Sequence, residues 1–364
     1  MGELFDDFRS IVKKRLPLID VRAPVEYEKG AFPGAVNLPL MSDEERRLVG
    51  IRYKERGNAE ALKLGHELVS GEIKKRRIEA WCSFVKSHPK ALLYCFRGGQ
   101  RSQISQEWMA LAGCPVPRLR GGYKAFRRYL IDETERIGGK LEPIILGGRT
   151  GSGKTLLLEK IAASIDLEAL ANHRGSAFGR KISPQPTQIS FENRLAYDLI
   201  EKTDSYGFRL VFEDEGRNVG RLYLPQALFS SFGEAPLVIL QTPMDRRVEI
   251  TWREYVADAQ REYLEIGSTE PLLEWKEAVS SAMDRIKRRL GGERHARVKS
   301  MLQSAFTEQI RSGSAEPHKE WVEYLLREYY DPMYDYQIEK RARRVVFTGD
   351  SDSVMEYLQE ALSS

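Results

Sequence analysis

The sequence predicts an α/β protein with two domains and a helical extension at its C-terminal end. Its 364 residues exceed what one small core requires. Short apolar runs alternate with stretches of helical periodicity, and beyond about Arg246 the pattern is almost wholly helical to Gln337. We therefore expect domains at residues 1–135 and 136–250, and a mostly helical region at 251–364 packed on the second domain.

Composition narrows the class of protein. Hydrophobic residues make up 41% of the chain, which is enough for two cores, and no apolar run has the roughly 18 residues of a membrane span. The first ten residues also lack the apolar stretch of a signal peptide. We expect a cytoplasmic protein without a membrane partner. The 57 basic and 53 acidic residues give a net charge of +4, which permits a nucleic acid partner without demanding one.

The expected elements of the first domain follow in order along the chain. A buried strand at 16–21 is followed by a turn and a short strand that ends at Asn37. Two or three helices should occupy residues 43–88, a strand 91–94, and a helix with Ile104, Trp108 and Leu111 on one side comes next. The polar stretch at 132–141 is the expected linker.

A cysteine directly follows the predicted strand at 91–94. A loop between a strand end and a helix N-terminus directs backbone N–H groups at a thiolate, so Cys95 is the candidate nucleophile. Gly98 and Gly99 let the backbone curl around a ligand, and Arg97 and Arg101 supply cations for an oxyanion or a charged sulfur intermediate.

The other two cysteines carry no such signal. Cys82 and Cys114 lack the paired spacing of a zinc site or a disulfide framework. All three cysteines are therefore expected to be free thiols in a reducing compartment, with only Cys95 chemically active.

The segments at 20–27 and 30–37 resemble the opening signature of rhodanese domains, and Tyr94 and Cys95 with the following loop are similar to the sulfur-carrying site of that family. The resemblance implies an N-terminal rhodanese-like α/β domain. Five residues separate Cys95 from Arg101, which is the spacing of the related cysteine phosphatases. This longer loop has room for a tetrahedral oxyanion, so it leaves phosphatase chemistry open and equally suits a selenophosphate donor.

The second domain opens with a phosphate-binding pattern. Residues 148–155 fit G-x-x-x-x-G-K-T between a predicted strand at 143–146 and a predicted helix at 156–165. Backbone amides would hold a diphosphate, Lys154 would neutralise it, and Thr155 is a candidate ligand of Mg²⁺. The predicted phosphate-binding residues are Gly148, Gly151, Ser152, Gly153, Lys154 and Thr155.

Further strands are expected at 209–212, 237–240 and 345–347, in a mostly parallel sheet like that of P-loop NTPases. Glu213 and Asp214 follow the first of these strands. They are candidates to order a metal-bound water or substrate, although acidic residues also occur at strand ends as solvated loop residues. The metal itself stays unknown.

The whole chain resembles the tRNA 2-selenouridine synthases. Long strings outside the two generic motifs carry this resemblance, namely residues 50–54, 64–71, 171–179, 213–217 and 329–332. The resemblance implies conversion of 2-thiouridine at the tRNA wobble position to 2-selenouridine through S-geranyl-2-thiouridine. The implied co-substrates are geranyl diphosphate and selenophosphate, and an enzyme that supplies selenophosphate is a candidate partner.

The same resemblance assigns roles to residues of this chain. Cys95 would carry selenium as an S-selanyl adduct, with Arg101 and the loop amides steadying the charge. The glycine-rich loop would hold the departing diphosphate. An anticodon loop of thiolated tRNA would be bound by cations and planar groups, and His173 and Arg174 are candidates for a substrate site or for a packed connector. Basic runs at 285–299 and 341–344 are candidates for phosphate contacts or solvated helix faces.

Three alternatives stay open. An ATP-dependent tRNA sulfurtransferase would lose all modification without ATP. If the chain is a non-catalytic P-loop and rhodanese binding protein, cells that carry Cys95→Ala would keep full selenation of their tRNA. A phosphatase would hydrolyse an aryl phosphate and lose that activity in Cys95→Ser.

Overall fold

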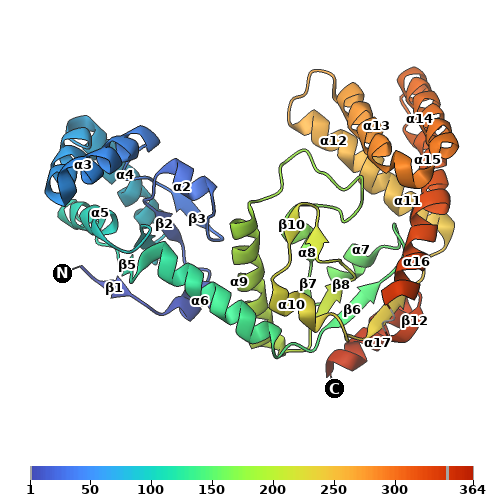
Figure 1. The fold of residues 1–364 in the computed structure, drawn as a ribbon, viewed down its shortest axis with the longest axis horizontal. Coiled ribbons are helices and arrows are strands. Elements are labelled where there is room, and N and C mark those ends of the chain that lie inside the picture. Colours follow the sequence, from blue (N-terminus) through green and yellow to red (C-terminus); the bar gives the residue numbers. More distant parts are fainter. Residues whose placement is uncertain (1, 342–343, 364) are drawn as a thin grey trace. The chain divides into compact units, whose positions relative to one another are not determined.

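The computed structural model describes residues 2–341 and 344–363. The chain forms two compact units. The first comprises residues 1–137 and 187–201, and the second comprises residues 138–186 and 202–364. Both units contain a parallel sheet with helices, which confirms the predicted α/β class with a helical C-terminal part (Figure 1).

The sheet of the first unit has five parallel strands in the order β1-β5-β4-β2-β3. Its strands are β1 (Leu4–Phe5), β2 (Leu18–Asp20), β3 (Ala35–Asn37), β4 (Leu92–Tyr94) and β5 (Arg118–Leu119). Every residue of β2 and β4 is buried, which accounts for their continuous apolar runs. The carboxyl end of β4 therefore presents Cys95 at the edge where ligands of parallel sheets bind.

Six helices accompany this sheet. They are α1 (Phe8–Lys13), α2 (Pro24–Glu28), α3 (Asp43–Leu68), α4 (Gly71–Ser87), α5 (Gln100–Leu111) and α6 (Gly122–Gly138). A capping box begins α3, in which Ser42 and Glu45 satisfy each other's backbone N–H groups, and Gly57 breaks its helical geometry with a φ of 81°. The linker expected at 132–141 is wrong, because α6 continues through Gly138 with Ile137 fully buried.

The prediction of three free thiols is wrong for two of them. Cys82 in α4 and Cys114 just after α5 are joined in a disulfide, with Cα atoms 5.7 Å apart. Thirty-two positions separate these cysteines, so the folding of α4 against α5 brings them together and no local pattern shows it. Cys95 is free, as expected.

A segment from the second half of the chain completes the first unit. Helix α9 (Gln188–Tyr206) begins there, and the Asn193 amide donates to the Ala31 carbonyl at 2.8 Å while accepting from Arg127 at 2.8 Å. The unbroken domain expected at 136–250 is corrected accordingly, because residues 187–201 group with the first unit.

The sheet of the second unit also has five parallel strands, in the order β12-β11-β6-β8-β7. They are β6 (Ile144–Gly147), β7 (Ser164–Ile165), β8 (Val211–Glu213), β11 (Leu237–Leu240) and β12 (Val345–Gly349), and a separate antiparallel pair joins β9 (Asn218–Val219) to β10 (Leu222–Tyr223). The parallel sheet and the late strand are confirmed. The helix predicted at 156–165 is wrong, because α7 (Lys154–Leu158) lasts only five residues before the chain turns into β7.

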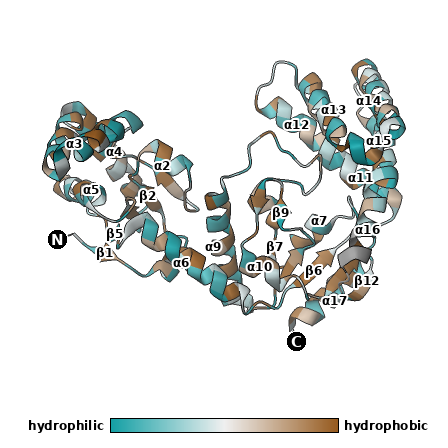
Figure 2. Ribbon diagram, viewed as in Figure 1, coloured by the Kyte–Doolittle hydropathy of each residue, from teal (hydrophilic) through white to brown (hydrophobic). Residues whose placement is uncertain are grey.

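The remaining helices belong to the second unit. They are α8 (Leu167–Ala171), α10 (Gln226–Ser231), α11 (Met244–Trp252), α12 (Asp258–Glu265), α13 (Pro271–Leu290), α14 (Gly292–Ser312), α15 (Lys319–Leu325), α16 (Asp331–Arg341) and α17 (Ser351–Ser363). Helices α11 to α15 enclose a core of their own around Trp275, Leu302 and Leu326, whereas α17 packs Val354 and Leu358 against the sheet. Figure 2 shows hydrophobic strands in both sheets and a mixture of hydrophilic and hydrophobic residues along α13 and α14.

None of the helices in the described ranges combines the length and the apolar character needed to cross a bilayer.

Candidate active site

The thiol of Cys95 lies at the start of the loop that joins β4 to α5. It is free and 3% exposed, and its Sγ atom lies 3.2 Å from the Ser102 hydroxyl oxygen and 3.9 Å from the Gly99 carbonyl oxygen. Gly98 adopts a φ of +65°, and a Cβ there would meet backbone atoms of 119–122 at 2.9 Å. The loop thus requires glycine at this position.

The two predicted arginines of the loop occupy different surroundings. Arg97 is exposed, whereas Arg101 donates to both carboxylate oxygens of Glu26, at 2.6 and 3.2 Å. Burial opposes ionisation of Glu26, but the hydrogen bonds and charge of Arg101, with the charge of Arg46, outweigh it and lower the pKa of that carboxyl. The structure therefore brings Arg101 to Glu26, an ion pair that sequence reasoning missed.

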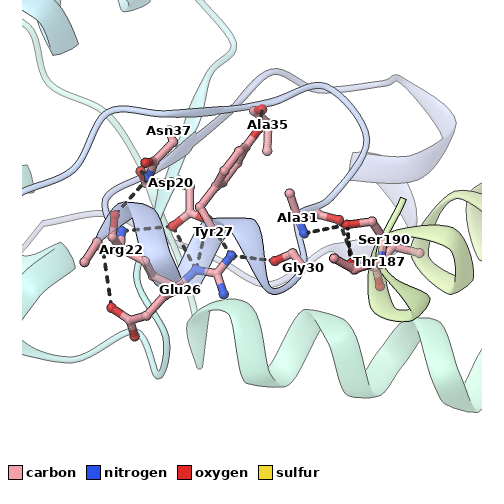
Figure 3. Close-up of polar contacts among 12 residues, drawn as sticks. Asp20, Arg22, Glu26, Tyr27, Gly30, Ala31, Ala35, Asn37, Thr187 and Ser190 are labelled. Atoms are coloured by element: carbon pink, nitrogen blue, oxygen red, sulfur yellow. Dashed lines mark hydrogen bonds and ion pairs between the residues drawn. The ribbon is translucent and has the colours of Figure 1, made fainter. Parts of the chain in front are cut away.

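The signature segment that precedes β3 forms a buried polar network (Figure 3). Arg22 makes an ion pair with Asp20 at 2.6 Å, with both side chains at most 3% exposed, and it also donates to the Gly30 carbonyl at 2.9 Å. The Asn37 amide donates to the carbonyls of Asp20 and Arg22, each at 2.9 Å. These residues therefore fix the loops beside the sheet and stand apart from the thiol chemistry.

The glycine-rich loop lies between β6 and α7. Gly148, Gly151 and Gly153 all have positive φ values, of 156°, 77° and 86°. A Cβ at Gly151 would lie 2.2 Å from the Thr251 hydroxyl oxygen, so the backbone passes too close for any side chain. Lys154 donates from Nζ to the Gly148 carbonyl at 2.7 Å, which folds its ammonium group back over the loop.

This loop borders a cavity of about 750 Å³ in the second unit. Every predicted phosphate-binding residue lines it, together with the cations Arg174, Arg246, Arg253 and Arg289 and the apolar or aromatic residues Leu156, Ile250, Tyr329, Tyr330, Met333 and Tyr334. The Ser152 hydroxyl is buried without a hydrogen-bond partner among the described residues. The Ser152 hydroxyl, which lies two positions before Lys154, is therefore suited to donate a hydrogen bond to an anionic oxygen of a ligand.

Three buried carboxyl groups, those of Glu168, Glu213 and Glu215, lie close to the glycine-rich loop. Burial, and next the charge of Glu215, raises the pKa of Glu168 to about 9, while burial and the charge of Glu213 raise the pKa of Glu215 to about 7. Burial, and next the charge of Glu168, raises the pKa of Glu213 well above its ordinary range. Each of these three carboxyl groups therefore keeps its proton to a higher pH than an ordinary glutamate does. No spacing signal in the sequence identified Glu168, and Glu215 was visible only within a longer string.

The acidic strand end predicted at 213–214 adjoins the glycine-rich loop. Thr155 Oγ1 donates to Glu213 Oε1 at 3.3 Å, and a second oxygen of Glu213 accepts from the backbone N–H of Glu168 at 3.3 Å. Asp214 lines the cavity. Within residues 2–341 and 344–363, no three His, Cys, Asp or Glu side chains form a metal-binding group. Thr155 and Glu213 are the residues that would hold Mg²⁺ at this loop.

His173 and Arg174 follow α8. His173 is 8% exposed, and burial, followed by the charges of Arg180 and Arg174, lowers its pKa and so favours the neutral ring. Arg174 lines the large cavity and makes an ion pair with Glu262 at 2.6 Å. The structure thus places Arg174 at the cavity, while His173 forms part of the adjoining turn with Arg180.

Comparisons with known proteins agree on one family. The tRNA 2-selenouridine synthase AAA domain matches residues 141–364, and the rhodanese-like domain matches residues 5–129. A tRNA 2-selenouridine synthase of Sulfurovum sp. (strain NBC37-1) is 60% identical over 354 residues, which cover 97% of each chain. Proteins of the same name from Hydrogenovibrio crunogenus and Cupriavidus pinatubonensis are 49% and 48% identical, covering 98% and 99% of both chains.

Proposed function

The chain belongs to the tRNA 2-selenouridine synthase family, and on this premise we propose that it converts 2-thiouridine at the tRNA wobble position to 2-selenouridine in two transfers. The first transfer alkylates the sulfur with geranyl diphosphate, and the second replaces the geranylated sulfur with selenium from selenophosphate. Thiolated tRNA is then the macromolecular substrate, and the reaction takes place in the cytoplasm.

One observation carries the first transfer, namely that the glycine-rich loop borders a cavity whose walls include cationic and apolar residues beside acidic ones. The thiocarbonyl sulfur attacks C1 of geranyl diphosphate, an S–C bond forms, and the C–O bond to diphosphate breaks. Lys154, the loop amides and the unpaired Ser152 hydroxyl would bind the diphosphate that leaves. Ile250, Met333 and the tyrosines are suited to a ten-carbon chain, which offers no polar atoms to bind.

The second transfer is supported by the thiol at the end of β4. Alkylation turns a poor leaving group into a thioether, from which geranyl thiol departs. Selenophosphate and water supply phosphate and selenium at the selenide level, and selenium replaces geranyl thiol at C2, so the net exchange is redox-neutral. In our proposal Cys95 carries the selenium as an S-selanyl adduct. A cellular disulfide takes up the two electrons lost when the S–Se bond forms and is reduced to two thiols. Two thiols return these electrons when the S–Se bond breaks, and they become a disulfide again as selenide is released. A selenophosphate-supplying enzyme is the matching partner.

Basic residues on α13 are suited to the tRNA backbone. Lys287 and Arg288 are exposed, and Arg289 of the same turn lines the large cavity. Other members of the two basic runs are engaged within the protein, because Arg285 donates to the Ala177 carbonyl and Lys299 pairs with Asp284. Residues 342–343 of the second run lie outside the described residues.

The test supplies each co-substrate separately. Thiolated tRNA is incubated with the full chain and geranyl diphosphate alone, with selenophosphate alone, or with both, and its nucleosides are analysed by mass spectrometry. We expect S-geranyl-2-thiouridine in the first reaction, no change in the second and 2-selenouridine in the third. Selenation without geranyl diphosphate would refute the two-transfer scheme, and a requirement for ATP would favour a sulfurtransferase.

A further inference from the structure

A second cavity, of about 150 Å³, lies in the first unit and is lined by residues of α3 and α5. Its walls are chiefly apolar, and the principal contributors are Leu40, Val49, Leu62, Val69, Ile104 and Trp108. Polar groups enter the lining from Asn58 and His66 of α3 and from Gln100 and Arg101, which form the first turn of α5. The cavity is therefore chiefly hydrophobic, and one of its polar parts adjoins the loop that starts from Cys95.

This cavity accounts for two strings that neither the rhodanese signature nor the thiol chemistry explains. Tyr53 comes from the string at 50–54, and Gly65 and Val69 come from the string at 64–71, and all three line the cavity. Tyr53 is 57% exposed, so a large aromatic ring stands at the solvent side. Gly65 leaves space open, because a Cβ there would meet only Val49, at 3.8 Å.

The cavity is also connected to the thiol through α5. Trp108 and Val69 belong to the same packed core as Cys95. Arg101 borders the cavity, and the next residue, Ser102, places its hydroxyl oxygen 3.2 Å from the Cys95 sulfur. A ligand in the cavity would thus have its polar end beside the turn that holds the reactive sulfur.

We propose that this cavity binds the geranyl chain of S-geranyl-2-thiouridine while Cys95 delivers selenium, an inference that rests on the proposed function. An apolar cavity of this volume accommodates a ligand about the size of benzene, which is close to one isoprene unit. The terminal isoprene unit would lie between Leu62 and Trp108, and the rest of the chain would lead back past Arg101 to the sulfur on C2. The geranyl chain is attached to the sulfur that selenium replaces. A site that binds this chain would therefore recognise the alkylated nucleoside.

Such a site would also select the intermediate over the starting nucleoside. Each methylene moved from water into an apolar cavity improves binding roughly fourfold. Plain 2-thiouridine has no chain to place there, so selenium transfer would act on the alkylated nucleoside alone. Cys95 would then not deliver selenium to unalkylated 2-thiouridine, whose sulfur is a poor leaving group.

The test compares two substrates with blocked and unblocked cavities. Thiolated anticodon stem-loops are alkylated beforehand with either a geranyl or a methyl group, and kcat/KM for selenium transfer is measured with the full chain. Leu62→Trp and Ile104→Trp fill the cavity from α3 and α5. Ala59→Trp and Gln103→Trp place the same side chain at exposed positions of the same helices outside the cavity. Hydrogen exchange of the strands of the first unit, which carries all four substitutions, reports whether each variant is folded.

We expect the unaltered chain and both exposed-site controls to prefer the geranyl substrate at least tenfold, and the filled variants to reduce that preference to within about threefold. An unchanged preference in filled variants whose first unit keeps its hydrogen-exchange protection would overturn the inference.

A second measurement needs neither turnover nor a variant. A stem-loop whose geranyl chain carries a photoreactive group is crosslinked to the unaltered chain, and the modified peptides are identified by mass spectrometry. Crosslinks to peptides of α3 or α5 support the inference, whereas crosslinks confined to other peptides contradict it. If the unaltered chain fails to selenate either substrate, the proposed function fails, and the crosslink map still decides whether the cavity binds the chain.

Discussion

Thr155 donates a hydrogen bond to Glu213 at 3.3 Å, which joins the last residue of the glycine-rich loop to the last residue of β8. Adjacent parallel strands place these residues together, because Leu146 of β6 pairs with Glu213 in register. The glycine-rich loop and the buried carboxyl cluster therefore form one site, with the Lys154 ammonium as a cation close to it.

Replacing Lys154 with Met should weaken diphosphate binding by about ten- to a hundredfold, because a charge-assisted hydrogen bond contributes about 1.5–3 kcal/mol. Lys154→Arg keeps the charge and is the matched control, which should retain most of the affinity. Isothermal titration with inorganic diphosphate measures the effect. Equal affinity in Lys154→Met and the unaltered chain would exclude this loop as the diphosphate site.

The buried carboxyls should make the second unit less stable as pH rises. The folded-state pKa values of Glu168 and Glu215, about 9 and about 7, lie above the ordinary value of 4.5. The folded chain then binds more protons than the unfolded chain, so the free energy of unfolding falls from about pH 4.5 upward. For Glu168 the loss should continue to about pH 9, at up to roughly 1.4 kcal/mol per pH unit.

Glu168→Gln removes this titration and should flatten the decline, as measured by urea unfolding between pH 5 and pH 9. Glu234→Gln is a suitable control, since this carboxyl is exposed on the loop before β11. A decline as steep in Glu168→Gln as in the unaltered chain would show that other groups cause it.

Cys95→Ser should abolish selenium transfer while geranyl transfer from geranyl diphosphate continues, because the thiol and the glycine-rich loop belong to different units. Mass spectrometry of tRNA nucleosides should then show the S-geranyl nucleoside accumulating. The double variant Cys82→Ser and Cys114→Ser should still selenate tRNA, because those sulfurs are bonded to each other. Selenation by Cys95→Ser would mean that another group carries the selenium.

Arg22→Met should destabilise the first unit by about 3–5 kcal/mol, because it leaves the fully buried Asp20 carboxylate without its partner. The measurement is denaturant unfolding, monitored by hydrogen exchange of the backbone amides in the strands of the first unit. Arg128→Met removes an exposed pair with Asp132 and should leave the transition unchanged within error. Similar transitions in both variants would show that the Asp20 and Arg22 pair contributes little.

Local patterns predicted much of this fold. The buried strands that end at Tyr94 and Gly147 are short apolar runs, and each leads into a glycine-containing loop, so the positions of the thiol and the phosphate loop could be inferred directly. The parallel direction of the strands in the second sheet could be predicted because strands alternate with helical segments along the chain. Chain pattern sufficed here because each feature depends on residues within about ten positions of one another.

Contacts between distant residues could not be predicted in this way. The ion pair of Arg101 with Glu26 spans 75 positions, and the hydrogen bond from Arg127 to Asn193 spans 66. Glu168 became a candidate only because folding buries it beside Glu215. The linker expected at 132–141 was also misjudged, because polar residues on the outer face of α6 disguise a helix whose other face buries Leu130 and Ile137.

The placement of residues 187–201 in the first unit has a consequence for synthesis on the ribosome. When residue 137 has been polymerised, the strands of that unit are all present but Asn193, which donates to the Ala31 carbonyl, is not. At about 5–20 residues per second, translation needs roughly 3–13 s more to reach residue 201. The nascent first unit therefore lacks part of its packing until α9 has been synthesised, and α9 follows the glycine-rich loop in the sequence. A fragment that ends at residue 137 would never acquire this helix.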